Sequence, residues 1–350
     1  MTINKDILNF IYENSSVSIK YRIEKEFYNN SDLKKLKTLQ NELINSKRAI
    51  HLIECLKNHK EYHGATLLSV ENSLNMLIDM GFNYNNGFVE FDNIIESISY
   101  EAKNRTINKN HILGYLSHIV IVPFLLRAGL RDEWLIEFTK YRIDTIYNFV
   151  KEKIYDIYDD LTEYKNIPKN FQNRQIIKPS LYKNGEIQFP LAYDIYAFSS
   201  LIDELNIEYR KKIYSIISYI IDERYFNIED GYGILSDKKN YWAMGWDSKL
   251  TDLSKEYQYN PLLLKLDLMS KFQVVQNSKW LADSIKFLNE FKSSNGLFYY
   301  PKNFLTEKNS SWILGNHMSL GENRKLKNSL SIEGTFRTIL IYKNLTHTKY

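Results

Sequence analysis

A segment in the middle of the chain, FPLAYDIY, places a carboxylate among aromatic side chains. Asp194 stands beside Tyr193 and two residues before Tyr196, at the start of an apolar stretch that follows Pro190. A carboxylate that projects into a cavity can act as a general acid or base. A carboxylate in the first turn of a helix is instead stabilised by the helix dipole. The sequence leaves both roles open for Asp194, and the two tyrosines are candidate binding residues.

A second segment, YWAMGWDSK, places Trp242, Trp246 and Asp247 around a glycine. Indole rings can line a ligand cavity by stacking against a sugar, and their π faces can stabilise a positive charge. Trp242 and Trp246 are therefore candidate binding residues, and Asp247 is a candidate catalytic carboxylate. The alternative is an aromatic plug on a loop that binds no ligand.

The segment EKNSSWILGNHMSLGENRK, at positions 307–325, has no helical period, although most of the chain does. It carries Trp312, His317 and Arg324 among glycines. A long loop in a compact domain usually has a functional reason, and binding groups tend to collect on such loops. We therefore treat His317 as a candidate catalytic residue, and Trp312 and Arg324 as candidate binding residues. The alternative for His317 is a local capping role.

The last helical pattern, LSIEGTFRTILIYKNL, carries Glu333 and Arg337 one helical turn apart. Both side chains are candidate binding residues that could converge with Trp312 of the preceding loop. Their spacing equally fits an i,i+4 ion pair on one helix face. The ion pair is the arrangement that we expect for these two residues.

The elements that position these residues are predicted to be helices. The chain has 350 residues, 44% of them hydrophobic, but only 6 prolines and 13 glycines to form loops and strand turns. Apolar residues recur at helical spacing, and the clearest stripe is Ile213, Ile216, Ile217, Ile220 and Ile221. Helical segments follow one another in pairs: 67–81 with 88–102, 112–129 with 134–154, and 193–205 with 209–221. Repeated pairs predict an all-α solenoid or a closed ring of helices.

A second repeat accompanies the pairing: a helix ends, a few polar residues follow, and a glycine precedes an aromatic or apolar residue. This pattern occurs at Gly64, at Gly231 with Tyr232, and at Gly296 with Phe298. In this pattern the chain resembles the terpenoid cyclase and protein prenyltransferase superfamily, although the glutamine of that family's repeats is replaced here. The resemblance implies an α/α toroid of about six or seven helical hairpins. It also implies a single domain over residues 1–350, with a central cavity.

The catalytic motifs of that superfamily are incomplete in this chain. Its protonating cyclases use an Asp-x-Asp-Asp acid, whereas the nearest match here, DIYDDL, has a different spacing and lies in a polar stretch. Its prenyltransferases use a zinc site of Asp, Cys and His, whereas the single cysteine, Cys55, lies on an apolar helix face. His59 and His63 are four residues apart, but the helix is expected to end there. We therefore predict no metal site and no cofactor.

The charged residues alternate in sign along the chain. Lys and Arg number 46 against 42 Asp and Glu, and the net charge is +4. This even distribution argues against a nucleic-acid partner. No secretory signal and no apolar run of membrane-spanning length is found, and the single cysteine is typical of a reducing compartment. We therefore predict a cytoplasmic protein without a membrane span.

Three classes of function follow from these observations. The resemblance implies a protein that binds or transforms a hydrophobic or isoprenoid-like small molecule. A carbohydrate-active α/α hydrolase or lyase is the second class, with Asp194, Asp247, His317 and Tyr193 as its working residues. A non-catalytic scaffold for a protein partner is the third. An open polar groove would favour a sugar, a closed apolar pocket a terpenoid, and an exposed apolar groove a scaffold.

Overall fold

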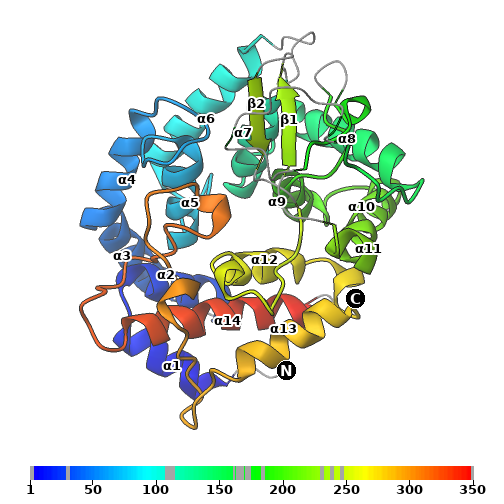
Figure 1. Ribbon diagram of the computed structural model, residues 1–350. Helices are drawn as coiled ribbons and strands as arrows, with labels where there is room; N and C mark the ends of the chain where they lie inside the picture. Colours follow the sequence, from blue (N-terminus) through cyan, green and yellow to red (C-terminus); the bar gives the residue numbers. More distant parts are fainter. Residues whose placement is uncertain are drawn as a thin grey trace. The chain divides into compact units, whose positions relative to one another are not determined.

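The chain folds into two compact units, each built mainly from helices (Figure 1). Unit 1 combines Met1–Ser99 and Thr251–Tyr350 with the short segment Arg127–Leu130. Unit 2 is the middle of the chain, Tyr100–Leu126 and Arg131–Leu250. The computed structural model describes residues 4–28, 32–106, 115–160, 162, 169, 175–182, 186–228, 232–236, 240–244 and 248–347.

The helices of unit 1 come from both ends of the chain. The first group is α1 (Lys5–Asn14), α2 (Val17–Phe27), α3 (Leu33–Ile44), α4 (Lys47–Lys57), α5 (Val70–Met80) and α6 (Val89–Asn104), whose last residues belong to unit 2. The second group is α12 (Leu262–Met269), α13 (Lys279–Asn289) and α14 (Ser329–His347). Between them lie the short 3₁₀ turns η6 (Glu256–Gln258), η7 (Gln273–Val275), η8 (Lys302–Phe304) and η9 (Trp312–Leu314).

Side-chain caps define where several of these helices begin. Ser46 caps α4 by accepting a hydrogen bond from the third N–H beyond it at 3.3 Å, and Ser69 and Ser278 cap α5 and α13 in the same way at 3.4 and 3.2 Å. Gly81 ends α5 with φ at +109°, where a Cβ would lie only 2.9 Å from the ring of Tyr21. Glycine suits this left-handed cap because it has no Cβ.

The core of unit 1 joins the first two helices to the last one. Ile11 of α1, Ile19 and Ile23 of α2, and Phe336 of α14 are fully buried in one hydrophobic cluster. Burial of each such side chain stabilises the fold by about 1.5–3 kcal/mol. The ring of Phe27 meets that of Phe336 edge-on, with 6.4 Å between centroids. This cluster therefore ties the two ends of the chain into one unit.

Unit 2 contains the helices of the middle of the chain and one short sheet. Its elements are α7 (Leu116–Arg127), whose last residue belongs to unit 1, α8 (Glu133–Val150), η3 (Pro179–Leu181), α9 (Ala192–Leu201), α10 (Ile207–Ile221), α11 (Glu223–Phe226), β1 (Tyr232–Ser236) and β2 (Asn240–Met244). The two strands form an antiparallel hairpin in which Ile234 lies opposite Trp242. Residues 241–244 therefore lie on a strand, whereas the alternative considered from the sequence was a loop.

The most extensive helix contact in unit 2 is between α8 and α10. Phe149 of α8 meets Tyr219 of α10, with 5.9 Å between their ring centroids. On α10, the isoleucine stripe predicted from the sequence is fully buried at Ile213, Ile216, Ile217 and Ile220. The stripe therefore faces the core of unit 2, as its helical spacing requires, and the opposite face of α10 carries polar residues.

The all-α fold class is confirmed, with the β1–β2 hairpin as a small addition. Each predicted pair of helical segments is present, as α5 and α6, α7 and α8, and α9 and α10. The packing partners differ from these pairs, because α8 contacts α10 most extensively, while α4 contacts α5. The α/α toroid and its single domain stay predictions. In the described part of the chain, no helix combines the length and the apolar character needed to cross a membrane.

Candidate functional site

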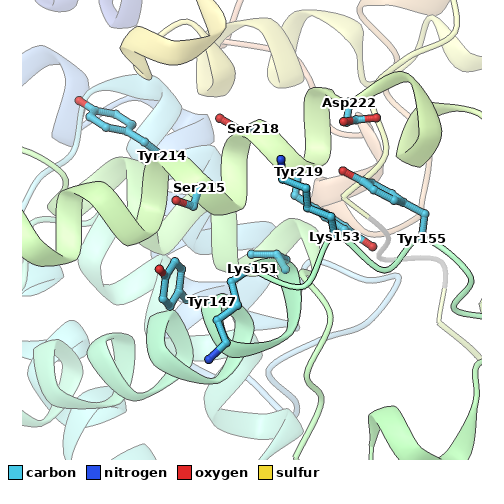
Figure 2. Close-up of a pocket in the computed structure, with 10 residues that line it drawn as sticks. Tyr147, Lys151, Lys153, Tyr155, Tyr214, Ser215, Ser218, Tyr219 and Asp222 are labelled. Atoms are coloured by element: carbon cyan, nitrogen blue, oxygen red, sulfur yellow. The ribbon is translucent and has the colours of Figure 1, made fainter.

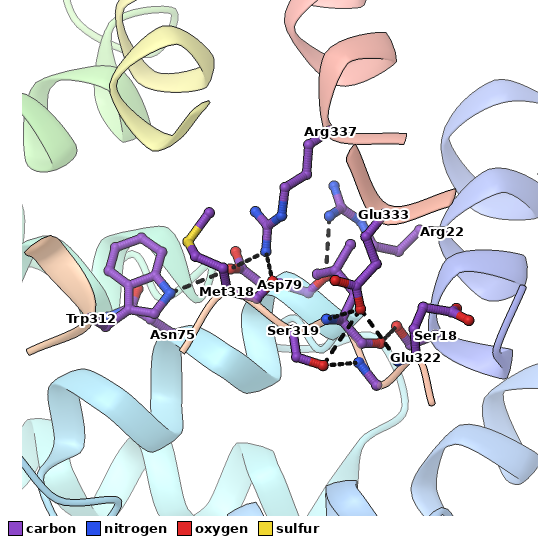
Figure 3. Close-up of polar contacts among 12 residues, drawn as sticks. Ser18, Arg22, Asn75, Asp79, Trp312, Met318, Ser319, Glu322, Glu333 and Arg337 are labelled. Atoms are coloured by element: carbon purple, nitrogen blue, oxygen red, sulfur yellow. Dashed lines mark hydrogen bonds and ion pairs between the residues drawn. The ribbon is translucent and has the colours of Figure 1, made fainter. Parts of the chain in front are cut away.

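The polar side chains of α5 face the interior of unit 1. Glu71, Asn72, Asn75 and Asp79 are all buried. Burying a polar group without a hydrogen-bond partner costs roughly 2–7 kcal/mol, so each of them needs a partner. They contact the loop at 307–324 and the side chains of Arg127 of α7 and Arg337 of α14, and Arg22 of α2 bonds the Asp79 carbonyl (Figure 3). The loop cluster comprises Arg22, Arg48, Glu71, Asn72, Asn75, Asp79, Arg127, Glu307, Trp312, His317, Ser319, Glu322, Arg324, Glu333 and Arg337.

Helix α5 fixes the loop at η9 by three hydrogen bonds. Asn72 Oδ1 accepts from the backbone N–H of Trp312 at 2.7 Å, and Glu71 Oε1 accepts from that of Ile313 at 3.0 Å. The indole Nε1 of Trp312 donates to Asp79 Oδ2 at 3.3 Å. Figure 3 shows the indole N–H directed toward Asp79. Because the Trp312 ring is fully buried, these bonds hold the loop inside unit 1.

Asp79 is surrounded by three arginines. Arg127 Nη2 lies 2.5 Å from Oδ1, and Arg337 Nη2 lies 3.3 Å from Oδ2. Arg22 Nη1 donates to the Asp79 backbone carbonyl at 3.1 Å. Burial alone would raise the pKa of Asp79, but the charges of Arg127 and Arg337 hold that pKa below its usual value. Asp79 is therefore ionised, and its two oxygens are occupied by structural contacts.

Glu333 of α14 is a second buried carboxylate in the loop cluster. Its Oε1 accepts hydrogen bonds from the N–H groups of Leu320 at 3.0 Å and Glu322 at 3.3 Å, and from Ser319 Oγ at 3.4 Å. Its Oε2 forms an ion pair with Arg324. Burial raises the pKa of Glu333 to about 7, against the opposing effect of the nearby arginines. Glu333 therefore organises the loop at 319–322 and changes its charge near neutral pH.

His317 is a third buried titratable group of the loop cluster. It adopts φ of +58°, a left-handed conformation that residues with a Cβ rarely adopt. Its side chain is buried, and Nε2 has no hydrogen-bond partner among the residues that the structure describes. Burial lowers the pKa of His317 and the charge of Arg48 lowers it further, while a hydrogen bond to the Ser310 backbone acts in the opposite direction. His317 is therefore neutral at pH 7.

Five residues predicted from the sequence belong to the loop cluster: Trp312, His317, Arg324, Glu333 and Arg337. The expected ion pair between Glu333 and Arg337 is wrong. Arg337 pairs with Asp79, and Glu333 pairs with Arg324. The physical reason is that both side chains are buried, so each finds a partner on another element instead of along its own helix surface.

Asp79 is the central residue that sequence reasoning missed. Its signal is a polar face within an otherwise apolar helix, in which Asn72, Asn75 and Asp79 recur at helical spacing. Polar residues on the buried face of a helix indicate an internal network, because they must be satisfied there.

In unit 2, Asp194 lies in the first turn of α9 and pairs with Arg142. Arg142 Nε lies 2.9 Å from Oδ1 and Nη2 lies 2.9 Å from Oδ2, and both side chains are 3% exposed. The N–H of Leu191 donates to Oδ2 at 2.9 Å. This geometry matches the helix-start role that the sequence left open, with both carboxylate oxygens engaged. Tyr193 and Tyr196 are buried beside Phe124, at ring distances of 5.6 and 6.2 Å.

The side chains of the tryptophan-rich segment at 241–247 lie outside the part of the chain that the structure describes. Trp242 lies on β2, where only the backbone is described. Trp246 and Asp247 lie outside the described residues. The predicted sugar-stacking role of this segment therefore stays a prediction.

A pocket of about 450 Å³ in unit 2 lies between the end of α8, the turn that follows it, and α10 (Figure 2). We call it the tyrosine pocket. It is lined by Tyr147, Tyr155, Tyr214 and Tyr219, by Lys151 and Lys153, and by Val150, Ser215, Ser218 and Asp222. Figure 2 shows Tyr155 and Tyr219 at one end of the pocket and Tyr147 and Tyr214 at the other. Polar and apolar groups contribute about equally to this lining.

One end of the tyrosine pocket is a wall of stacked aromatic rings. The rings of Tyr155 and Tyr219 are stacked 4.5 Å apart and within 6° of parallel. The guanidinium of Arg224 covers Tyr155 at 4.3 Å, and Arg224 Nη2 donates to Asp222 Oδ2 at 2.7 Å. Hydrogen bonds from Arg224 hold the pKa of Asp222 well below its usual value. Asp222 is therefore ionised, and it positions the wall through Arg224.

Several polar groups of the tyrosine pocket have no partner among the described residues. Lys153 adopts φ of +52°, and its ammonium forms no hydrogen bond or ion pair there. The hydroxyls of Ser218 and Tyr214 are likewise unpaired, and both residues are at least partly exposed. Lys151 contacts only Asn148, at 3.1 Å. Lys153, Ser218 and Tyr214 are therefore available to a ligand without breaking a contact within the described residues, whereas Lys151 would exchange its contact with Asn148.

The chain was compared with known proteins. No protein-family model, curated protein or solved structure matches it. The described residues contain no group of three or more His, Cys, Asp or Glu side chains that could hold a metal ion. The superfamily resemblance therefore stays a prediction, and the function has to be inferred from the geometry of the sites.

Proposed function

We propose that unit 2 binds a carbohydrate in the tyrosine pocket, and that acidic sugars bind more tightly than neutral ones. The observation that carries this proposal is the pocket lining, which combines aromatic rings with the hydroxyls of Ser218 and Tyr214 and the ammonium of Lys153, none of which has a partner among the described residues. A volume of about 450 Å³ lies in the range of small-molecule sites.

A sugar matches this lining because it has two kinds of surface. Its C–H faces pack against aromatic rings, which Tyr147 and Tyr214 provide. Its hydroxyls exchange hydrogen bonds with side chains such as Ser218 and Tyr214. A purely hydrophobic ligand such as an isoprenoid would instead bury these polar groups unpaired, at a cost of roughly 1–3 kcal/mol for each group. The lining therefore favours the carbohydrate over the isoprenoid-like ligand.

The preference for acidic sugars follows from the charges of the pocket. Two lysines, Lys151 and Lys153, line it, while its described lining has one carboxylate, Asp222. Arg224 already neutralises Asp222. A sugar carboxylate would therefore meet an uncompensated ammonium at Lys153, and a charge-assisted hydrogen bond is stronger than a neutral one.

The proposal is for binding and not for hydrolysis. Glycoside hydrolases use two carboxyl groups, one of which must be protonated to act as an acid. Among the described lining residues, Asp222 is the single carboxylate, and its low pKa keeps it ionised. A partner acid for Asp222 is not present in the described lining.

Isothermal titration calorimetry of the full chain with trigalacturonate and maltotriose tests the proposal. We expect trigalacturonate to bind more tightly than maltotriose, because the acidic sugar can pair with Lys153. Lys153→Ala should weaken trigalacturonate binding about tenfold and should bring its affinity close to that of maltotriose. Tyr214→Ala should weaken both sugars by similar factors, because the ring contributes stacking without charge.

Matched control variants are available on the same unit. Lys211 lies on α10 and is exposed, and Tyr100 of α6 is 74% exposed, and neither lines the pocket. Lys211→Ala and Tyr100→Ala should leave both affinities unchanged. The proposal fails if neither sugar binds, or if the pocket variants and the control variants behave alike.

A further inference from the structure

Two turns of unit 1 contain the same dipeptide, Asn-Gly. Asn86–Gly87 lies between α5 and α6, and Asn295–Gly296 follows α13. Both asparagines are exposed, and both glycines have a left-handed backbone, with φ of +82° at Gly87 and +83° at Gly296. The two turns are therefore matched in sequence and local conformation, and they differ in their hydrogen bonds. The third such dipeptide, at 184–185, lies outside the described residues.

An asparagine that precedes a glycine can lose its side-chain amide without an enzyme. The backbone nitrogen of the glycine attacks Cγ of the asparagine, so that a C–N bond forms and the Cγ–Nδ2 bond breaks. The proton from the backbone nitrogen passes to the leaving nitrogen, which departs as ammonia and leaves a cyclic succinimide. One water molecule then opens the ring to aspartate or isoaspartate. Glycine favours the attack because it has no Cβ beside its nitrogen.

Hydrogen bonds restrain this attack at Asn295–Gly296. The N–H of Gly296 donates to the carbonyl of Ser293 at 2.9 Å, so the attacking nitrogen is engaged. Asn295 Oδ1 accepts from the N–H of Leu297 at 3.0 Å and from the hydroxyl of Ser293. Asn295 Nδ2 donates to the hydroxyl of Tyr299 at 3.3 Å. The side chain must break these bonds before it can turn toward the backbone nitrogen.

The reacting groups are less restrained at Asn86–Gly87. The N–H of Gly87 and Oδ1 of Asn86 have no hydrogen-bond partner among the described residues. Asn86 Nδ2, which is the leaving nitrogen, lies 2.7 Å from Asn83 Oδ1 and 3.4 Å from the Tyr84 carbonyl. The backbone carbonyl of Asn86 accepts from Gln40 Nε2 at 2.5 Å, but this oxygen takes no part in the reaction.

We propose that Asn86 is a site of spontaneous deamidation in the folded protein, whereas the fold protects Asn295. The carboxylate formed at position 86 cannot donate the bonds that Nδ2 makes to Asn83 and Tyr84. It also adds a negative charge to a turn in which Asp92 Oδ1 already accepts from the N–H of Asn85, at 3.2 Å. The modification lies in unit 1 and does not depend on carbohydrate binding in unit 2.

Incubation of the full chain in mildly alkaline buffer at physiological temperature tests the proposal. Peptide mass spectrometry of samples taken over time measures the conversion of each asparagine. In water enriched in heavy oxygen, the product takes up the label because water opens the succinimide. We expect Asn86 to convert about tenfold faster than Asn295, since the attack at Asn295 must first break the hydrogen bond of the Gly296 nitrogen.

The same chain unfolded in urea is the matched control. Unfolding removes the hydrogen bonds of both turns, so Asn86 and Asn295 should convert at similar rates there. Asn86→Gln should abolish conversion at position 86, because the longer side chain would have to close a larger ring. Ser293→Ala removes one contact of the Asn295 side chain and should raise the conversion of Asn295 alone. Circular dichroism confirms that each variant is folded.

Three outcomes would overturn the proposal. One is conversion of Asn295 in the folded chain at the same rate as Asn86, or faster. Another is a ratio of the two rates in urea as large as in the folded chain, which would assign the difference to the flanking sequence. The third is an Asn86 that converts in urea but stays intact in the folded chain over the same period.

Discussion

The loop cluster of unit 1 and the tyrosine pocket of unit 2 contain similar residue types that are engaged in different ways. In the loop cluster, Asp79 and Glu333 are buried, and their oxygens accept contacts from η9, α7, α14 and the loop at 319–324. In the tyrosine pocket, Lys153 and Ser218 are exposed and have no partner in the described part of the chain. Paired, buried groups stabilise a fold, whereas unpaired groups on a pocket wall remain available to a ligand.

This difference separates residue type from role. Trp312 and Asp79 are residue types that often occur in binding sites. Here they bond to each other, and this hydrogen bond holds the loop in place. Within the loop cluster, some buried nitrogens of Arg48, His317, Arg324 and Arg337 are the exception, because they have no hydrogen-bond partner among the described residues. We therefore expect substitutions in the loop cluster of unit 1 to affect stability and substitutions in the tyrosine pocket to affect binding.

The largest expected effect is that of Asp79→Ala. The substitution leaves the buried Arg337 and the partly exposed Arg127 without their counter-charge, and breaking a buried ion pair in this way costs about 3–5 kcal/mol. Urea denaturation followed by far-UV circular dichroism measures the loss. A loss below about 1 kcal/mol would show that Asp79 does not anchor the loop cluster.

The next effect is a pH dependence that comes from Glu333. Its pKa is raised from the usual 4.5 to about 7 on folding, so the folded chain binds this proton more tightly than the unfolded chain does. The stabilising contribution of Glu333 is therefore fully present below pH 4.5 and declines, by about 3 kcal/mol, as the pH rises to about 7.

Glu333→Gln cannot titrate and isolates this contribution. We expect the stability of the native chain relative to Glu333→Gln to fall between pH 4.5 and 7.5, as measured by urea denaturation at several pH values. Parallel profiles of the two proteins would contradict the assignment. Other groups of the loop cluster, such as His317, contribute to both profiles and cancel in the difference.

A smaller loss is expected for Trp312→Phe. The variant keeps a buried aromatic ring but loses the hydrogen bond from Nε1 to the Asp79 carboxylate and weakens the contact with Arg127, which lies 4.7 Å from the indole. The loss should be about 2 kcal/mol. Trp280, whose Nε1 donates to the Thr251 carbonyl at 3.1 Å, provides the matched control Trp280→Phe. If Trp280→Phe lowered the free energy of unfolding more than Trp312→Phe does, the contacts of Trp312 with Asp79 and Arg127 would not be especially stabilising.

The smallest effect on stability is expected in the tyrosine pocket. Ser218→Ala removes an exposed hydroxyl without a partner, so it should change the free energy of unfolding by less than about 0.5 kcal/mol. The same variant should weaken trigalacturonate binding severalfold in calorimetry. Unchanged binding would remove Ser218 from the site, and a marked loss of stability would contradict the contrast between the two regions.

The helices could be predicted from the sequence because their signal is local. The isoleucine stripe of α10 has helical spacing, and the structure buries it. The network around Asp79 could not be predicted, because Trp312 lies 233 residues and Arg337 lies 258 residues from Asp79 in the chain. Spacing along one helix suggested a pair between Glu333 and Arg337, but long-range contacts determine the partners of both.

The tyrosine pocket shows a second limit of sequence reasoning. The isoleucine stripe of α10 indicated which face of the helix is buried. The pocket lining lies on the other face, which carries Tyr214, Ser215 and Ser218 at helical spacing. Residues with hydroxyl groups are common on exposed helix faces. They indicate a pocket only when a second element lies beside them. Here the turn at 151–155 provides Lys151, Lys153 and Tyr155.

The most direct test of the account is amide hydrogen exchange of the full chain with and without saturating trigalacturonate. The ligand is expected to contact the tyrosine pocket only, because the side chains of the loop cluster hold the loop at 307–324 in place. We predict increased protection at 147–155 and 214–222, with no change at 307–324. Protection confined to 307–324, with the tyrosine pocket unchanged, would contradict the account.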